Sequence, residues 1–280
     1  ICACLVGSEM CIRDRDMMVD SLGLYAVGLP DVQYHFHGLD PNDVVDHAYR
    51  AVGYLFGHDA PVKPGETIAI MGETGCGKTS LINLIPRFYE PTKGEVRIDD
   101  IPVQNFRLSD LRKQIGLATQ DVLLYSDTIE GNIAYGDSSI DLEEVEKFAK
   151  YSAASDFISK MPEGYDTVVG ERGVGLSGGQ KQRISLARAL AVRPSILILD
   201  DTTSAVDMET EKQIQEALRH LDFSCTKVII AQRISTTMMA DKILVMQHGR
   251  ITEMGNHEEL MAKKGYYYEL VQLQTGEDLV

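Results

Sequence analysis

The stretch GETGCGKT, Gly72–Thr79, constrains what this chain can fold into more than any other part of the sequence. It fits the pattern G-x-x-x-x-G-K-[ST], and it lies between an apolar run, TIAIM, and a segment with helical spacing, Lys78–Phe88. Glycines let the backbone curl so that successive N–H groups point inward at phosphate oxygens, and the start of a helix adds partial positive charge. We therefore predict a phosphate-binding loop, with an ordinary glycine turn that caps a helix as the alternative.

The side chains of this loop have predicted parts in holding a nucleotide. Lys78 reaches the terminal phosphates and is counted among the catalytic residues, and the Thr79 hydroxyl ligates Mg²⁺. The other residues of the loop that we expect to contact the nucleotide are Gly72, Thr74, Gly75, Cys76, Gly77 and Ser80.

A second acidic site follows an apolar run, ILILDD, which spans Ile196–Asp201. It places Asp200 at the carboxyl end of a strand, where open α/β sheets bind ligands, so Asp200 can hold Mg²⁺ opposite Thr79. The alternative is an aspartate that ends a strand in an ordinary turn. Another short apolar run, Lys227–Ala231, follows a helical segment, and strands that alternate with helices predict an α/β fold with a largely parallel sheet.

Two further elements are predicted from local patterns. The segment Ile140–Met161 has Leu142, Val145, Phe148 and Ala149 at helical intervals, which predicts a helix. The segment Asp241–Gly255 is expected to form a hairpin that turns at His248–Gly249.

Composition and charge exclude several classes of protein. The chain has 280 residues, a formal net charge of −15 and no run rich in Lys or Arg, so we expect no nucleic-acid-binding surface. No apolar stretch approaches the roughly 18–20 residues that span a bilayer, so any membrane part must come from other polypeptide. The five cysteines show no paired metal-ligand spacing, which favours a reducing compartment over a disulfide framework.

The N-terminal segment differs from the rest of the chain. CLVGSEMCIRDR, Cys4–Arg15, has no clear periodicity and looks like translated adapter sequence, with a native tail as the alternative. We expect residues 1–42 to be non-native or unstructured and residues 43–280 to form the functional domain.

The string LSGGQKQR, Leu176–Arg183, is the most diagnostic in the chain. Ser177, Gly178 and Gly179 would expose N–H groups at a helix start, which makes a second anion cradle. The alternative is a flexible loop with a helix cap. With the phosphate loop before it and ILILDD after it, the string resembles the signature of the nucleotide-binding domain of ATP-binding cassette (ABC) transporters, in particular the exporter type.

The resemblance covers about Val62–Gln274 and implies a P-loop NTPase core with an antiparallel β-subdomain and a helical subdomain at about 120–192. It implies two domains, head to tail, around two ATP molecules with Mg²⁺. In that arrangement the signature serves the ATP of the partner domain, and Gln120 contacts the magnesium ion and links the site to the membrane domain. Glu171 would touch the membrane domains. The residues expected to reach the partner's ATP are Ser177, Gly178, Gly179, Gln180 and Asp207, and those expected at the metal are Thr79, Gln120 and Asp200.

Two positions depart from the family pattern. The family has Glu, which polarises the attacking water, where this chain has Asp201, and it usually has His where this chain has Gln232. Asp201 is one methylene shorter than Glu, and Gln232 cannot carry a positive charge. The predicted consequence is a weakly hydrolytic site of its own and an intact signature lent to a heterodimeric partner. The alternative is ordinary turnover in a homodimer.

Three tyrosines are candidates for the residue that stacks on adenine. The family places an aromatic residue about 25 positions before the phosphate loop, and Tyr49 is the best-placed candidate, with Tyr54 and Tyr34 as alternatives. A tyrosine packed at the edge of the sheet is the other interpretation of each.

The resemblance predicts an ATPase domain that drives export from the cytoplasmic side of a membrane through transmembrane domains outside this chain. Two other classes stay open: a soluble ABC ATPase that acts on nucleic acid or ribosomes, and a regulatory module that binds ATP without hydrolysis. Selectivity for the transported substrate would reside in the membrane domain.

Overall fold

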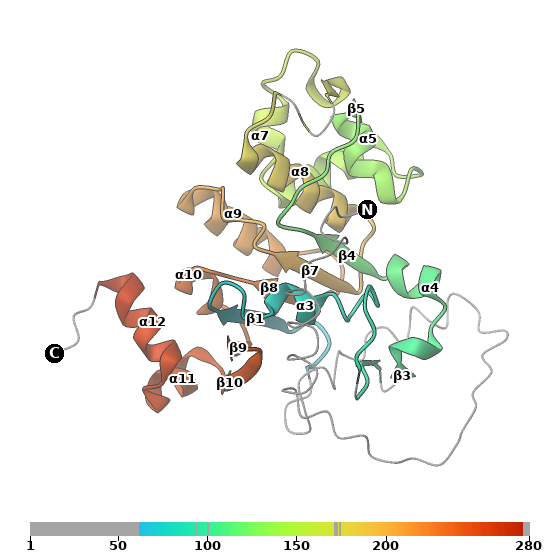
Figure 1. The fold of residues 1–280 in the computed structure, drawn as a ribbon. Coiled ribbons are helices and arrows are strands. Elements are labelled where there is room, and N and C mark those ends of the chain that lie inside the picture. Colours follow the sequence, from blue (N-terminus) through green and yellow to red (C-terminus); the bar gives the residue numbers. More distant parts are fainter. Residues whose placement is uncertain (1–61, 93, 100, 171–172, 174, 277–280) are drawn as a thin grey trace. The chain divides into compact units, whose positions relative to one another are not determined.

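The computed structural model describes residues 62–92, 94–99, 101–170, 173 and 175–276. Within them strands alternate with helices, which confirms the predicted α/β class (Figure 1). The described chain divides into two compact units, of which residues 62–111 with 230–276 form the first and residues 112–229 form the second. The boundary predicted near residue 43 lies outside the described residues.

The first unit carries the phosphate loop and both ends of the described chain. Its elements are β1 (Thr67–Gly72), α3 (Lys78–Ile82), β2 (Arg97–Ile98), β3 (Ile101–Pro102), η2 (Val103–Asn105), α10 (Ile234–Thr237), β9 (Lys242–Gln247), β10 (Arg250–Gly255), α11 (His257–Lys263) and α12 (Tyr266–Thr275), with α4 (Leu108–Lys113) at its boundary.

The sheet of the first unit is built on the buried strand β1. It runs parallel to β9, and β9 turns back into the antiparallel strand β10. His248 and Gly249 make that turn with φ values of 50° and 76°, a combination that suits a two-residue hairpin because it matches the twist of the strands. The hairpin predicted at these two residues is confirmed. The small pair β2–β3 is also antiparallel.

The C-terminal helices α11 and α12 lie side by side in Figure 1, and α11 also contacts β10. Their apolar faces share a buried cluster with α10 and β9, and in that cluster Leu260 and Tyr267 have no exposed surface. None of the helices in the described ranges is both long and apolar enough to cross a membrane.

The second unit contains the acidic strand and the signature. Its elements are β4 (Ile115–Ala118), β5 (Asp127–Thr128), α5 (Ile129–Ile133), η3 (Ala134–Gly136), α6 (Leu142–Tyr151), α7 (Ser155–Ile158), η4 (Gly164–Asp166), β6 (Val168–Val169), α8 (Gly178–Ala191), β7 (Ile196–Asp200), α9 (Met208–Arg219) and β8 (Thr226–Ile230).

Helix α8 is the centre of the second unit, because it contacts α5, α6, β4 and β7. Ile184, Ala187 and Leu190 recur on one face at spacings of three residues, and all three are fully buried. The helix ends before Arg193, whose φ of 45° is left-handed, and Pro194 follows, which disfavours a helical residue before it.

The helical segment predicted over Ile140–Met161 is divided in two. Ala153 adopts a φ of 54° between α6 and α7, a left-handed conformation that a continuous helix cannot contain. Val145, Phe148 and Ala149 are fully buried as their spacing predicted, whereas Leu142 is 45% exposed because it starts the helix. The helix predicted over Lys78–Phe88 is also shorter, since regular α3 ends at Ile82, before Pro86.

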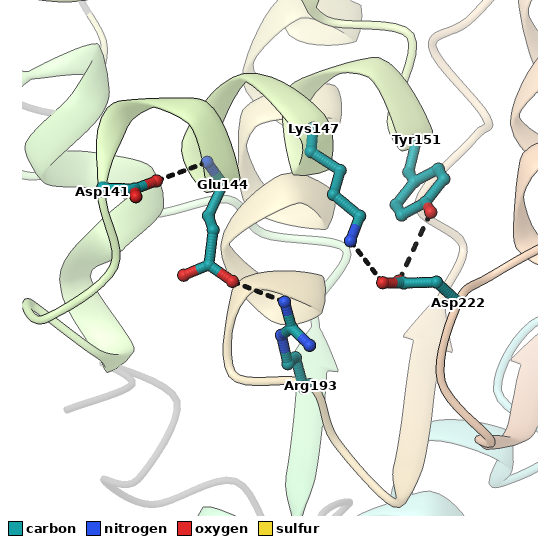
Figure 2. Close-up of polar contacts among 6 residues, drawn as sticks. All are labelled: Asp141, Glu144, Lys147, Tyr151, Arg193 and Asp222. Atoms are coloured by element: carbon teal, nitrogen blue, oxygen red, sulfur yellow. Dashed lines mark hydrogen bonds and ion pairs between the residues drawn. The ribbon is translucent and has the colours of Figure 1, made fainter.

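Charged side chains of α6 form ion pairs and hydrogen bonds with residues that are distant in the sequence of the second unit, as Figure 2 shows. Glu144 accepts a hydrogen bond from Arg193 (2.5 Å), and Lys147 forms an ion pair with Asp222, which lies between α9 and β8. The Tyr151 hydroxyl also donates to Asp222 (3.4 Å). Because these side chains are a third or more exposed, each ion pair should contribute at most about 1 kcal/mol to stability.

Candidate functional site

The glycines of the predicted phosphate loop are demanded by the fold. A Cβ on Gly72 would lie 2.1 Å from the backbone oxygen of Met246 in β9, so no other residue fits beside that strand. Gly77 has a φ of 97° and immediately precedes α3. The backbone therefore curls between a buried strand and a helix start, as the sequence pattern predicts.

Lys78 bends back over the loop. Its Nζ donates hydrogen bonds to the backbone oxygens of Gly72 and Glu73, each at 2.8 Å, and it lies 3.7 Å from the Cys76 Sγ. These contacts hold the ammonium group within the loop, where it can meet an anion. Among the other predicted contacts, Thr74, Gly75 and Thr79 are exposed, Ser80 is half-buried and Cys76 is buried.

Gln232 lies close to the strand that leads into this loop. The N–H of Ala231 donates to the carbonyl of Ile70 in β1 (3.1 Å), which places Gln232 beside the carboxyl end of β1. Gln232 is exposed. The first unit therefore brings Gln232 and the phosphate loop to the same end of β1.

Asp200, Asp201 and Gln120 lie at one edge of the sheet in the second unit. Strands β4 and β7 are parallel with Ala118 opposite Leu199. Asp200 ends β7, Asp201 follows it, and Gln120 lies two residues past the end of β4, so all three lie at the same end of these strands. Asp200 is 4% exposed and Asp201 is 7% exposed, whereas Gln120 is exposed. The position predicted for Asp200, at the carboxyl end of a buried strand, is confirmed.

Asp201 has an unusual backbone. Its φ of 50° is in the left-handed region, which costs energy for most residues but is adopted more readily by Asp and Asn. The family's Glu has no such advantage there. An aspartate at this position therefore suits the left-handed backbone better than a glutamate would.

The signature begins α8 with a capping box. The Ser177 Oγ accepts a hydrogen bond from the Gln180 N–H (3.3 Å), and the Gln180 Oε1 accepts one from the Ser177 N–H (2.9 Å). Each bond satisfies a backbone N–H that a helix start would otherwise leave without a partner. The interpretation as a helix cap is thus correct. The Ser177 N–H, which was expected to face an anion, is bonded to Gln180 instead, but the Ser177 hydroxyl still carries a hydrogen that it can donate to an anion.

Gln182 is a residue of this site that the sequence analysis missed. Its buried side chain donates to the Ser204 Oγ (3.3 Å) and to the backbone oxygen of Asp201 (3.5 Å), and it accepts from the N–H of Ala205 (3.2 Å). The signal in the sequence was its spacing of three residues from Gly179, which places both on one face of α8. A Cβ on Gly179 would lie 2.7 Å from the Ala205 backbone oxygen, so this face packs directly on the segment Ser204–Asp207.

Asp207 acts as the cap of α9. Its carboxylate accepts hydrogen bonds from the backbone N–H (2.9 Å) and the hydroxyl (2.8 Å) of Thr210. These bonds, with a smaller contribution from the charge of Arg183, lower the pKa of Asp207. The carboxylate is exposed and stays ionised.

The predicted residues thus fall into two sets. The phosphate loop and Gln232 belong to the first unit, and Gln120, Asp200, Asp201, the signature and Asp207 belong to the second. Tyr49, its alternatives Tyr34 and Tyr54, and Glu171 lie outside the described residues.

The donor set predicted for magnesium fits that metal by its chemistry, since Thr79, Gln120 and Asp200 all offer oxygen and Mg²⁺ prefers oxygen ligands. Among the residues that the structure describes, no three His, Cys, Asp or Glu side chains form a cluster that could hold a metal.

Comparison with protein families shows a match with the ABC transporter family over residues 56–204. A domain of unknown function, DUF4261, also matches residues 20–85, most of which lie outside the described part of the chain.

Individual relatives are similar over most of this chain. An ATP-dependent lipid A-core flippase of Syntrophus aciditrophicus is 47% identical over 84% of the chain and 39% of the flippase. A putative multidrug export ATP-binding/permease protein of Staphylococcus aureus is 52% identical over 76% of the chain and 37% of that protein. The structure of a bacterial Atm1-family ABC exporter with ATP bound matches with a TM-score of 0.75 and 40% identity, over 81% of this chain and 41% of that one. The chain spans about two fifths of the length of the curated relatives that it matches.

Proposed function

This chain belongs to the ABC transporter family, and from that premise we propose that it is the ATP-binding domain of an exporter whose own ATP site cleaves slowly. The relatives named above are a flippase and an export protein, and the solved neighbour is an exporter with ATP bound. They support export over the alternative of an ATPase that acts on nucleic acid or ribosomes, and so does the net charge of −15.

Binding of ATP would use the first unit. Lys78 is already oriented by the carbonyls of Gly72 and Glu73, so it can turn its ammonium to the β- and γ-phosphates with little loss of side-chain freedom. The loop's backbone N–H groups would share the remaining phosphate charge. Bound magnesium would neutralise part of that charge through Thr79, Gln120 and Asp200.

The partner's ATP would be served by the second unit. The first turn of α8 is closed by its capping box, and Gln182 and Gly179 hold it against Ser204–Asp207. A preformed donor set of this kind loses little entropy when it closes on an anion. We assign Ser177, Gly178, Gly179, Gln180 and Asp207 to the ATP of a second domain, in a heterodimer that works with transmembrane domains at the cytoplasmic side of a membrane.

Slow cleavage would follow from Asp201 and Gln232. A general base must lie within about 2.6–3.2 Å of the proton that it removes. Asp201 is shorter than Glu by one C–C bond, about 1.5 Å, and errors of about 1 Å can cost a hundredfold in rate. One observation carries the proposal: the signature starts α8 with a complete capping box, whereas the position of the family's Glu holds the shorter Asp201 in a left-handed backbone.

Nucleotide binding can be tested with the chain itself by titration with a fluorescent ATP analogue in the presence of Mg²⁺. Lys78→Ala should weaken binding at least ~100-fold, because it removes the cation that meets the terminal phosphates. Lys63→Ala, which removes an exposed lysine of the same unit, is the matched control and should bind like the wild type.

The division of labour needs a competent partner domain. In a purified complex we expect ATP turnover to fall to near background when the partner's catalytic Glu is changed to Gln. A complex that keeps its turnover after that change would contradict the proposal and favour ordinary hydrolysis at Asp201.

A further inference from the structure

Helix α12 lies outside every motif of the sequence, yet one of its faces is directed at the segment that carries Gln232. Tyr267, Val271 and Gln274 are spaced by four and three residues, so they share a face of the helix. Tyr267 and Val271 are buried in one cluster with Ile234, the first residue of α10. Packing of this face therefore brings Gln274 to the start of α10.

Gln274 makes two hydrogen bonds there with its side-chain amide. Its Nε2 donates to the backbone oxygen of Gln232, and its Oε1 accepts from the backbone N–H of Ile234, both at 2.9 Å. A side-chain amide offers a donor and an acceptor side by side, which suits such a pair of contacts. The loop between the two bonded residues is closed by a side chain that lies 42 residues further along the chain than Gln232.

This contact replaces a local helix cap. Arg233 precedes α10 and makes no side-chain capping bond, so the N–H of Ile234 depends on Gln274 for its partner. The other end of α12 reaches the phosphate loop, where burial and then the charge of Glu73 raise the pKa of Tyr266. One helix therefore contacts both segments that the first unit contributes to the site.

We propose that Gln274 is a positioning residue, which holds the loop of Gln232 at the distance where its side chain meets the γ-phosphate of bound ATP. The inference rests on the proposed function, since that function places Gln232 beside the γ-phosphate. Gln274 itself touches neither nucleotide nor water in this role; it acts through the backbone of Gln232 and Ile234.

The test uses three variants of the whole chain. Gln274→Ala removes both hydrogen bonds, and Gln274→Glu keeps an acceptor for Ile234 but places a carboxylate oxygen against the carbonyl of Gln232. Gln272→Ala is the matched control, because Gln272 lies in the same helix and its side chain bonds to nothing in the described part of the chain. Gln274 is exposed, so its replacement should leave the fold intact.

The first measurement is hydrogen exchange at the Ile234 amide without nucleotide. Loss of one such bond should speed exchange about five- to tenfold in Gln274→Ala. Gln274→Glu and Gln272→Ala should exchange like the wild type. Unchanged exchange in Gln274→Ala would show that the contact does not hold the loop, and it would overturn the proposal.

The second measurement compares exchange over residues 232–234 with Mg²⁺–ADP and with the Mg²⁺ complex of an imido-bridged ATP analogue. In the wild type and in Gln272→Ala the γ-phosphate should slow exchange, whereas both Gln274 variants should lose that difference and keep their affinity for ADP. A difference that persists in Gln274→Ala would overturn the positioning role. A chain that binds neither nucleotide would contradict the proposed function itself, and exchange without nucleotide would still report whether Gln274 holds the loop.

Discussion

The start of the signature helix and the loop of Gln232 are held in opposite ways. Ser177 and Gln180 cap each other within four residues, and Gly179 and Gln182 pack on the segment that follows β7. The backbone oxygen of Gln232 accepts a hydrogen bond instead from the exposed side chain of Gln274, which lies 42 residues further along the chain. The first of these segments is capped by its own residues, whereas the second takes one of its hydrogen bonds from a side chain that is distant in the sequence.

The largest effect is expected when the family residues are restored at positions 201 and 232. Asp201→Glu with Gln232→His would return the longer acid and an imidazole, and we expect turnover at the chain's own site to rise roughly 100-fold. Single-turnover cleavage of bound ATP measures it, with Asp201→Asn as the control that gains no reach. If the double variant cleaves no faster than the wild type, the two departures do not limit the reaction.

Substitution of the two signature glycines tests how closely the start of α8 packs on the segment Ser204–Asp207. Gly179→Ala places a methyl group 2.7 Å from the Ala205 oxygen, whereas in Gly178→Ala the nearest atom is 3.6 Å away. Denaturant unfolding should show a loss of about 1–3 kcal/mol for the first and a gain of up to about 1 kcal/mol for the second, because alanine favours the helix. Equal stabilities would mean that α8 does not press on this segment.

The capping box should contribute a smaller amount. Ser177→Ala removes the oxygen that accepts from the Gln180 N–H, and it should cost about 1 kcal/mol in the free energy of unfolding. Ser177→Thr keeps a hydroxyl and should lose much less. Urea unfolding of the wild type and the two variants measures these differences. If Ser177→Ala is as stable as the wild type, the capping box does not stabilise the start of α8.

The smallest effect is expected at the charged contacts of α6 in Figure 2. The hydrogen bond and charge of Lys147 lower the pKa of Asp222, so its contribution is present above the unfolded pKa and is lost as pH falls through the folded value. Asp222→Asn should therefore lower the free energy of unfolding by less than about 1 kcal/mol at pH 7, since both side chains are a third or more exposed. The difference from the wild type should vanish below about pH 3, and a difference that persists there would point to a cause other than charge.

Much of the fold could be predicted because its signals are local. The glycines around Lys78, the apolar strand that ends at Asp200 and the turn at His248 and Gly249 each combine residue type with a short spacing. The break at Ala153 could not be predicted, because alanine favours helices and the left-handed φ there depends on how α6 and α7 pack. Gln182 was missed for a related reason, since a glutamine in a helix is usually solvated and only its contacts show that it is buried.

By itself the sequence determined the phosphate loop, the signature and the two departures from the family pattern, because each depends on residues that are neighbours along the chain. Only the tertiary structure decided that Gln274 holds Gln232 and that Gly179 lies against Ala205. A hydrogen bond between residues 42 positions apart is set by how helices pack on a shared core, and no local spacing encodes that distance.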